Sequence, residues 1–275
     1  MTLDINRLSA LIAIRSMVGL AAENQQMLQW LSSTLVSIGF CCRIEGQDTT
    51  EQPLLVASFT ARKGSADKKL VLYNHYDVAP VRANEPWKSQ DPFVLQLIDG
   101  RLYGRGIADN KGPLYARIEA LSKVVASGFE LPNILWLIQG EEEIIRGERV
   151  ATKLMAAEIA QFAGNVFVEE TGFFDIEQRQ PLAFLWSPTL PANALTGWQP
   201  LLEQTLGSHR LEYRHLNKLN GVRSCPLLSN LPSKAVYIGF GPNDKLHQIH
   251  CKNESLDAER LQLYRQQFVR FIRAY

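Results

Sequence analysis

Apolar side chains recur along the chain at the two spacings that distinguish helices from strands. Residues 23–39 carry apolar positions at helical spacing, and Gly39 closes this stripe as a typical helix stop. Similar patterns predict further helices at 112–127, 148–158 and 256–273. Compact apolar runs predict strands at 54–59, 70–73, 133–138, 165–168 and 235–240. Because strands alternate with helices through the first 170 residues, the sequence predicts an α/β fold with helices on both faces of a sheet.

Two regions depart from this alternation. Residues 94–105 predict a hairpin, because the Asp99-Gly100 dipeptide suits the type I′ turn that joins two antiparallel strands. Residues 172–232 contain six prolines and show no clear period. We expect one or two strands and a helix in this region, but the pattern does not locate them.

The composition narrows the class of protein. The chain has 275 residues, enough for one large core, with 46% hydrophobic and 21% charged residues, as in ordinary globular proteins. Its net charge of +1 gives no basis for binding nucleic acid or a membrane surface. The four cysteines form no C-x-x-C pair, and neither a signal peptide nor an apolar run of membrane-spanning length is visible. We therefore expect a cytoplasmic protein with reduced thiols.

Histidines and acids gather directly after the predicted strands. His75 and Asp77 follow 70–73, Asp109 follows a glycine-rich turn, the glutamates 141–143 follow the strand ending at 138, Glu169 and Glu170 end the strand 165–168, and His250 follows the strand ending at 240. The carboxyl ends of strands in an open α/β sheet form one edge, where ligands bind. Imidazole and carboxylate ligands without cysteine are typical of a catalytic zinc site.

The number of these side chains fits two metal ions better than one. Each ion would take one histidine and one terminal carboxylate, and a further carboxylate would bridge both ions. Such a site uses His75, Asp109, Glu143, either Glu169 or Glu170, and His250. One acid of the 141–143 run then remains free to act as a base.

Five short motifs resemble, in the same order, those of one known enzyme family. They are His75-Tyr76-Asp77-Val78, Trp87 with Asp91-Pro92-Phe93, the run from Asp99 to Gly106, Asp109-Asn110-Lys111-Gly112 and Gly140-Glu141-Glu142-Glu143. The sequence is similar to the co-catalytic zinc amidohydrolases and peptidases, which include succinyl-diaminopimelate desuccinylase, acetylornithine deacetylase, aminoacylase, glutamate carboxypeptidase and carnosinase. Gly241-Pro242, His250 and Asn253-Glu254 resemble the C-terminal motif of that family, so the similarity spans residues 20–170 and 235–275.

The resemblance implies a fold, a cofactor and a set of metal ligands. The fold is a three-layer α/β/α catalytic domain with a mixed, mostly parallel sheet, and the cofactor is two zinc ions, or cobalt or manganese in their place. His75 and the Glu169/Glu170 position would bind one ion, Glu143 and His250 the other, and Asp109 both. Aligning the Glu-Glu-Thr-Gly run at 169–172 with the usual Glu-Pro-Thr-Gly of the family favours Glu169.

The resemblance also implies roles for residues that do not bind metal. Asp77 would orient His75 through the second ring nitrogen of the imidazole, and Glu142 would be the general base. His250 is favoured over His247 as the ligand because of its place before Asn253-Glu254. The Asp109–Asn110 peptide bond is expected to be cis, as it often is in the family.

One departure from the family concerns its lid domain. Glu169 and His250 are only 81 residues apart, which leaves no room for a further domain of about 100 residues beside the rest of the sheet. We expect a single catalytic domain over residues 1–275, shortened at 172–232, without a lid, and monomeric. In the family the lid supplies a histidine for the oxyanion and an arginine for the substrate carboxylate. The local candidates to replace them are His209, His215, Arg210, Arg214 and Arg223.

The function that this resemblance implies is a di-zinc hydrolase. It would cleave an amide bond in a small peptide or an N-acyl amino acid, by metal-activated water with Glu142 as the base. Two alternatives remain: a pathway-specific deacylase or peptidase that acts on a larger precursor, and a non-catalytic metal-binding scaffold protein.

Overall fold

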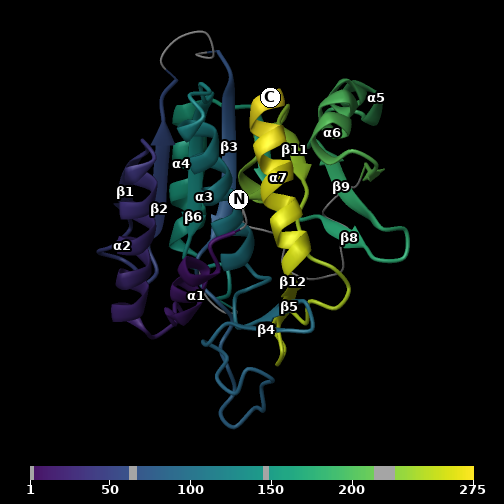
Figure 1. Ribbon diagram of the computed structural model, residues 1–275. Helices are drawn as coiled ribbons and strands as arrows, with labels where there is room; N and C mark the ends of the chain where they lie inside the picture. The colour runs from purple at the N-terminus through teal and green to yellow at the C-terminus, as the bar shows by residue number, and fades with distance from the viewer. Residues whose placement is uncertain (1–2, 62–66, 145–148, 214–226) are drawn as a thin grey trace.

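The computed structural model describes residues 3–61, 67–144, 149–213 and 227–275 (Figure 1). Within these ranges, nine strands form one sheet in the order β1-β2-β6-β3-β7-β11-β9-β10, with β8 paired to β9. In chain order the strands are β1 (Cys41–Glu45), β2 (Leu54–Phe59), β3 (Lys69–His75), β6 (Asn133–Gln139), β7 (Val166–Glu169), β8 (Phe173–Asp175), β9 (Gln180–Trp186), β10 (Arg210–Glu212) and β11 (Val236–Gly239).

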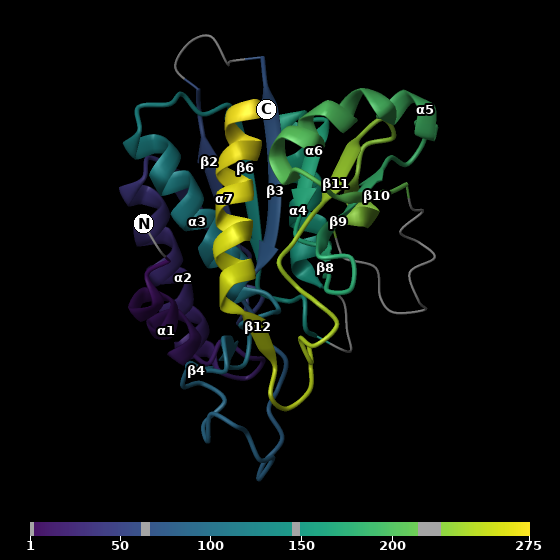
Figure 2. The same ribbon diagram turned by 45° about the vertical axis from the view of Figure 1, so that its right-hand side comes forward.

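The centre of this sheet is parallel, and the strand next to it on each side runs in the opposite direction. Strands β6, β3, β7 and β11 run in one direction, whereas β2 and β9 run against their inner neighbours. The mixed sheet implied by the sequence is therefore confirmed. The carboxyl ends of the four central strands meet at one edge, which is the lower edge in Figure 2.

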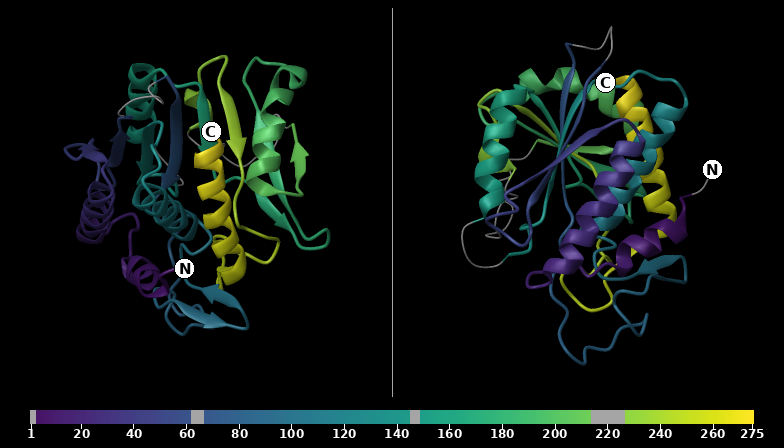
Figure 3. Two further views of the ribbon diagram at one scale, coloured as in Figure 1. Left: turned by 45° about the horizontal axis from the view of Figure 1, so that its top comes forward. Right: turned by 90° about the vertical axis from the view of Figure 1, so that its left-hand side faces the viewer.

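Helices cover both faces of the sheet. On one face lie α1 (Ile5–Ala13), α2 (Ala21–Ser37), α3 (Lys111–Ala126), α5 (Ala192–Leu195), α6 (Gln199–Leu206) and α7 (Ala258–Ala274), and on the other lies α4 (Val150–Phe162). Leu72 and Trp136 face the first group, and Val71 and Tyr73 face α4, because successive side chains on a strand point to opposite faces. The right-hand view of Figure 3 shows α4 across the sheet from the N-terminal helices. Short 3₁₀ turns lie at Thr196–Trp198 and Leu228–Asn230.

A second, three-stranded sheet lies beyond the carboxyl edge of the main one (Figures 1 and 2). It consists of β4 (Gln96–Ile98), β5 (Arg101–Tyr103) and β12 (Ser255–Asp257). The hairpin between β4 and β5 turns at Asp99 and Gly100 with φ of 49° and 78°, so both residues adopt the left-handed conformation expected of the predicted turn. Pairing of β12 with β5 brings the C-terminal part of the chain to the segment that leads into Asp109.

The regular elements agree with the sequence patterns, but the irregular region does not. Helix α1 and strand β1 were not predicted, because each is too short for a clear period. Region 172–232 holds three described strands and two short α-helices instead of the one or two strands and single helix expected. These described strands extend the main sheet, while the assignment of residues 1–275 to a single lidless domain stays a prediction. Every helix in the described ranges is too short or too polar to cross a membrane.

A substitution at Gly112, in the first turn of α3, tests how closely that helix packs against the turn before it. A Cβ at this position would overlap the carbonyl oxygen of Ile107, so the turn leading to Asp109 would have to shift. We expect Gly112→Ala to lower the free energy of unfolding by about 1–3 kcal/mol, as overpacking does. At Gly197 an added Cβ has open space, so Gly197→Ala should change stability by less than about 0.5 kcal/mol. Urea denaturation of both variants measures the difference, and equal stabilities would refute this account of the turn.

Candidate metal centre

Five separate segments each deliver one candidate ligand to the carboxyl edge of the sheet. His75 and Glu169 are the last residues of β3 and β7, and Glu143 lies in the turn after β6. Asp109 lies just before the N-terminus of α3, and His250 lies in the connection from β11 to β12. The parallel direction of the central strands is therefore the reason that residues so far apart in sequence share one edge.

Asp109 lies at the centre of the cluster. Its Oδ1 is 2.9 Å from Nε2 of His75, and its Oδ2 is 3.1 Å from Nε2 of His250. The same His250 nitrogen is 3.0 Å from Oε2 of Glu143. One ligand atom each from His75, Asp109 and Glu143 lies within 4.8 Å of the others. Each oxygen of one carboxylate thus faces a different imidazole, which is the arrangement expected of a carboxylate shared by two cations.

Asp77 holds two members of this cluster in place. Its Oδ1 lies 3.2 Å from Nδ1 of His75, and its Oδ2 accepts a hydrogen bond of 2.8 Å from the backbone N–H of Glu143. A carboxylate at Nδ1 keeps the proton of a neutral imidazole on that side and leaves Nε2 free as a ligand. Asp77 is itself buried. Asp77 therefore lies behind the ring of His75.

Glu169 lies on the same face of the sheet as His75. The pairing of Leu72 with Val168 places Glu169 beside Tyr73, two residues before His75. Its carboxylate accepts hydrogen bonds from the hydroxyl groups of Thr171 and Tyr237. Burial raises the pKa of Glu169, while the hydrogen bond from Tyr237 opposes that shift.

Glu170 points to the opposite face and is held there by other groups. The side-chain amides of Asn74 and Asn110 donate to its two oxygens, and the guanidinium of Arg117 lies 3.9 Å away. Burial, together with the neighbouring charge of Glu169, raises the pKa of Glu170 to about 8. Glu170 is thus occupied by a buried polar network, which supports the choice of Glu169 as the ligand.

The glutamates of the 141–143 run have different surroundings. Glu141 is buried, and its carboxylate accepts a hydrogen bond of 3.0 Å from the backbone N–H of Ala151 at the start of α4. No described residue donates a hydrogen bond to the carboxylate of Glu142. Burial raises the pKa of Glu142, and the charge of Asp109 adds to this, although His75 acts in the opposite direction. A carboxyl group with a raised pKa and no fixed partner suits the exchange of protons.

Burial and mutual contacts shift the pKa values of the four central groups. Hydrogen bonds to Asp109 and Glu143 raise the pKa of His250 to about 10. His75 also has a pKa well above its usual value, because its bonds to Asp109 and Asp77 outweigh its burial. Burial raises the pKa of Glu143 to about 7. Burial would also raise the pKa of Asp109, but the hydrogen bonds from His250 and His75 hold it well below the usual range.

The donor set fits divalent cations. Two imidazole nitrogens and several carboxylates converge, and no described lysine or arginine forms an ion pair with Asp109, Glu142, Glu143 or Glu169. Once the two imidazoles lose their protons, a bound cation would offset the cost of burying these carboxylates. Imidazole and carboxylate ligands suit zinc, and also cobalt or manganese.

Of the candidates proposed to replace the functions of the lid, the two that lie in the described residues, His209 and Arg210, are not brought to this centre. His209 is exposed, and its Nδ1 lies 2.8 Å from the carbonyl oxygen of Gly207. Arg210 begins the edge strand β10 and pairs with Asp175 at 3.3 Å and with Glu212 at 3.2 Å. Strand β10 is three strands from β7, on the order of 14 Å at the usual spacing. His215, Arg214 and Arg223 lie outside the described residues.

The geometry bears on two further expectations. The Asp109–Asn110 peptide bond is cis, as expected. His250, rather than His247, contacts Asp109 and Glu143. The ring of His247 lies 5.9 Å from that of Phe173, and burial lowers its pKa.

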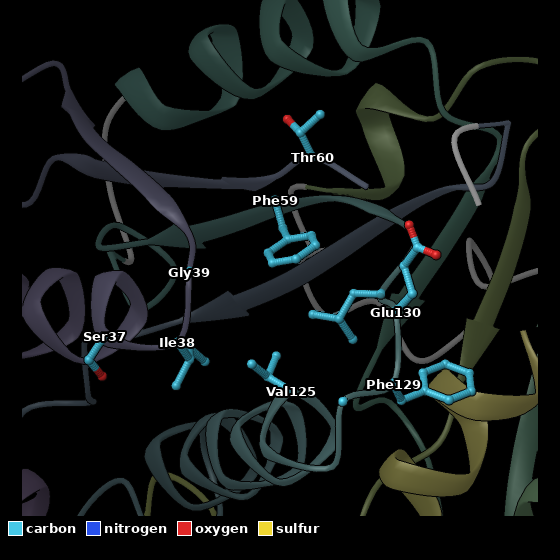
Figure 4. A pocket seen from close by; sticks show the side chains of 10 residues that line it. Ser37, Ile38, Gly39, Phe59, Thr60, Val125, Phe129 and Glu130 are labelled. Atoms are coloured by element: carbon cyan, nitrogen blue, oxygen red, sulfur yellow. The ribbon is translucent and has the colours of Figure 1, made fainter. Parts of the chain in front are cut away.

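A separate pocket of 740 Å³ lies at the opposite edge of the sheet. Figure 4 shows its lining from the ends of α2, β2 and α3, with Ile38, Phe59 and Val125 directed toward its interior. Glu130 is the one ionisable side chain of this lining, which contains neither histidine nor cysteine. The groups that can perform chemistry therefore lie at the carboxyl edge and not in this pocket.

A comparison with protein families identifies the chain. The model described as "Peptidase family M20/M25/M40" matches residues 71–274. This chain belongs to that family. The family resemblance found in the motifs is confirmed by this match.

Relatives and solved structures of M20 peptidases agree with this assignment. The Beta-Ala-His dipeptidase of Homo sapiens is 36% identical over 141 residues, which is 50% of this chain and 26% of that protein. The succinyl-diaminopimelate desuccinylase of Parvibaculum lavamentivorans is 36% identical over 132 residues, 46% of this chain and 32% of that protein. The matched segments thus span only about a quarter to a third of these curated relatives.

Solved structures confirm the α/β fold. The M20 family metallo-carboxypeptidase Sso-CP2 from Sulfolobus solfataricus superposes with a TM-score of 0.69 at 15% identity, covering 100% of this chain and 99% of that one. Human carnosine dipeptidase 1 gives a TM-score of 0.66 at 14% identity, covering 98% and 96%. At these identities the likeness concerns the fold alone.

The affinity of this centre for zinc should fall as the pH is lowered from 8 to 6. Each imidazole must lose its proton before it binds a cation, and the raised pKa values of His75 and His250 keep those protons bound at neutral pH. Isothermal titration calorimetry in buffers of different ionisation enthalpy should show net proton release on zinc binding. His250→Ala should weaken zinc binding. His209→Ala is the control, because His209 is exposed and should not affect zinc binding. An affinity that is constant from pH 8 to 6 would contradict the ligand set.

Proposed function

We propose that this protein is a two-metal hydrolase that cleaves the amide bond of a small peptide or an N-acyl amino acid. The observation that carries this proposal is the position of Asp109, whose two oxygens face the imidazoles of His75 and His250. The names of the relatives also support it, because they include dipeptidases, a metallodipeptidase and desuccinylases.

The ligands divide between two positions on either side of Asp109. His75 and Glu169 form one position, and both lie on the face of the sheet toward α4. Glu143 and His250 form the other, with their donor atoms 3.0 Å apart. Asp109 contributes one oxygen to each position. Zinc is the proposed metal, with cobalt and manganese as alternatives.

A pair of divalent cations at this centre would polarise the scissile carbonyl and lower the pKa of a water molecule to about 7. Glu142 would accept the proton of that water and later return it to the leaving nitrogen. Its carboxylate suits this role because no described residue holds it by a hydrogen bond and burial raises its pKa. Asp77 would keep His75 in the correct ring orientation throughout.

Glu142→Gln tests the base directly. The substitution keeps the shape of the side chain but removes its ability to accept a proton, so we expect kcat to fall at least ~100-fold with metal content and melting temperature unchanged. Glu141→Gln is the matched control, because Glu141 is bonded to the start of α4 and should retain most activity. Steady-state kinetics on the best substrate distinguish the two variants. If Glu142→Gln were as active as the unaltered protein, the role would belong to another residue.

A substrate screen tests the reaction class. Zinc-loaded protein should release amino acids from dipeptides or N-acyl amino acids, bind about two zinc ions per chain and lose activity with a chelator. Cleavage restricted to longer peptides would favour a precursor-processing peptidase. Two bound zinc ions without any hydrolysis would favour the scaffold alternative. Sedimentation of the same sample tests the proposed lidless monomer, for which a mass near 31.0 kDa is expected.

A further inference from the structure

The Asn253-Glu254 pair has no part in the proposed chemistry, although it lies only a few residues after His250. Glu254 is 1% exposed, which is unusual for a glutamate. Such a burial requires that each oxygen be supplied with hydrogen-bond donors. The groups that donate these hydrogen bonds indicate the role of Glu254.

All four donors to Glu254 belong to the turn that leads into Asp109. Oε1 accepts hydrogen bonds from the backbone N–H groups of Ala108 at 2.9 Å and Asp109 at 3.0 Å. Oε2 accepts from the N–H of Gly106 at 3.0 Å and from the Arg105 guanidinium at 2.8 Å. A carboxylate offers about four acceptor sites, so its capacity is filled.

The same segment is fixed on its other sides. The guanidinium of Arg105 is also buried and lies 5.2 Å from the ring centre of Trp87. The side-chain oxygen of Asn253 accepts a hydrogen bond of 2.7 Å from the backbone N–H of Lys88. Strand β12, which begins at Ser255, then pairs with β5. The His250 connection is therefore attached to the Asp109 turn immediately beyond its candidate ligand.

We propose that Glu254 is a positioning residue that sets the distance between Asp109 and His250, and thereby the metal affinity of the centre. This inference rests on the proposed metal-binding function. Asp109 and His250 are 141 residues apart in the chain, and both are needed on the same ion. Glu254 joins their two segments through a single carboxylate. It acts on the backbone of Asp109 and touches no reacting atom, so its effect should appear in metal binding before it appears in chemistry.

The test is the zinc affinity of folded Glu254→Gln, measured by competition with a chelator. In glutamine an NH₂ group replaces one of the two carboxylate oxygens. This group is a donor and would face two other donors of the Asp109 turn, so the turn must move. We expect affinity to fall about 10–100-fold, the range typical when a group that orients metal ligands is lost. In cobalt-loaded protein, the visible absorption spectrum should change, because it reports the geometry of the ligands.

Asp244→Asn is the matched control. Asp244 is a fully buried carboxylate in the same connection, paired with Arg101 at 2.9 Å and with Arg260. It accepts no hydrogen bond from the Asp109 turn among the described residues. Both substitutions should lower the melting temperature, but Asp244→Asn should leave zinc affinity within about threefold of the unaltered protein.

The outcomes separate this inference from the proposed function. If the unaltered protein bound no zinc, the proposed function itself would fail. If it bound zinc and folded Glu254→Gln bound it equally well, the positioning role would be refuted. Should Glu254→Gln not fold, Glu254→Asp decides by the same measurement. That side chain keeps the charge but is one methylene shorter, so it cannot reach all four donors and should also bind zinc more weakly.

Discussion

The arrangement at the carboxyl edge depends on one carboxylate, that of Asp109. Its two oxygens face two imidazoles that are 175 residues apart in the chain, so a shift of Asp109 would break the contact that joins the two histidines. The backbone around Asp109 is fixed on both sides. Glu254 binds its N–H and the N–H before it, and the following residue, Asn110, donates to Glu170. The parallel strands form the carboxyl edge at which the ligands meet, and these contacts fix the position of Asp109 at that edge.

The buried acids of this region fall into two groups that differ in their partners. Glu170 and Glu254 lie beside buried arginines, Arg117 at 3.9 Å and Arg105 at 2.8 Å, and accept several hydrogen bonds. Among the described residues, no lysine or arginine forms an ion pair with the second group, which consists of Asp109, Glu142, Glu143 and Glu169. Asp109 and Glu143 are paired instead with imidazoles. The hydrogen bonds of the first group suit a structural role. The second group is the one that we propose binds cations.

The sequence predicted most of what lies at the centre of the molecule. The strands that deliver His75 and Glu169 are apolar runs with clear ends, and the Asp99-Gly100 turn has the chemistry of its type. The order of the motifs identified the family. These features are local, so they can be read from neighbouring residues.

What the sequence did not predict depends on contacts between distant segments. Strands β8 and β10 have three residues each, and their pairing with β9 holds them in the sheet. His209 and Arg210 were candidates by residue type, but Arg210 begins strand β10 at the edge of the sheet, and His209 directly precedes that strand. The choice of Glu169 over Glu170 is supported by which face each residue points to. Arg117, which lies beside Glu170, belongs to α3 but falls outside the motif at the start of that helix. The role of Glu254 was likewise hidden, since its four donors lie almost 150 residues earlier.

The most direct test of the shared carboxylate is a crystal structure of the zinc-loaded protein with anomalous scattering measured at the zinc edge. The account predicts two anomalous peaks about 3.5–4 Å apart, one on each side of Asp109, with His75 next to one and His250 next to the other. A single peak, or peaks that Asp109 does not touch, would contradict it.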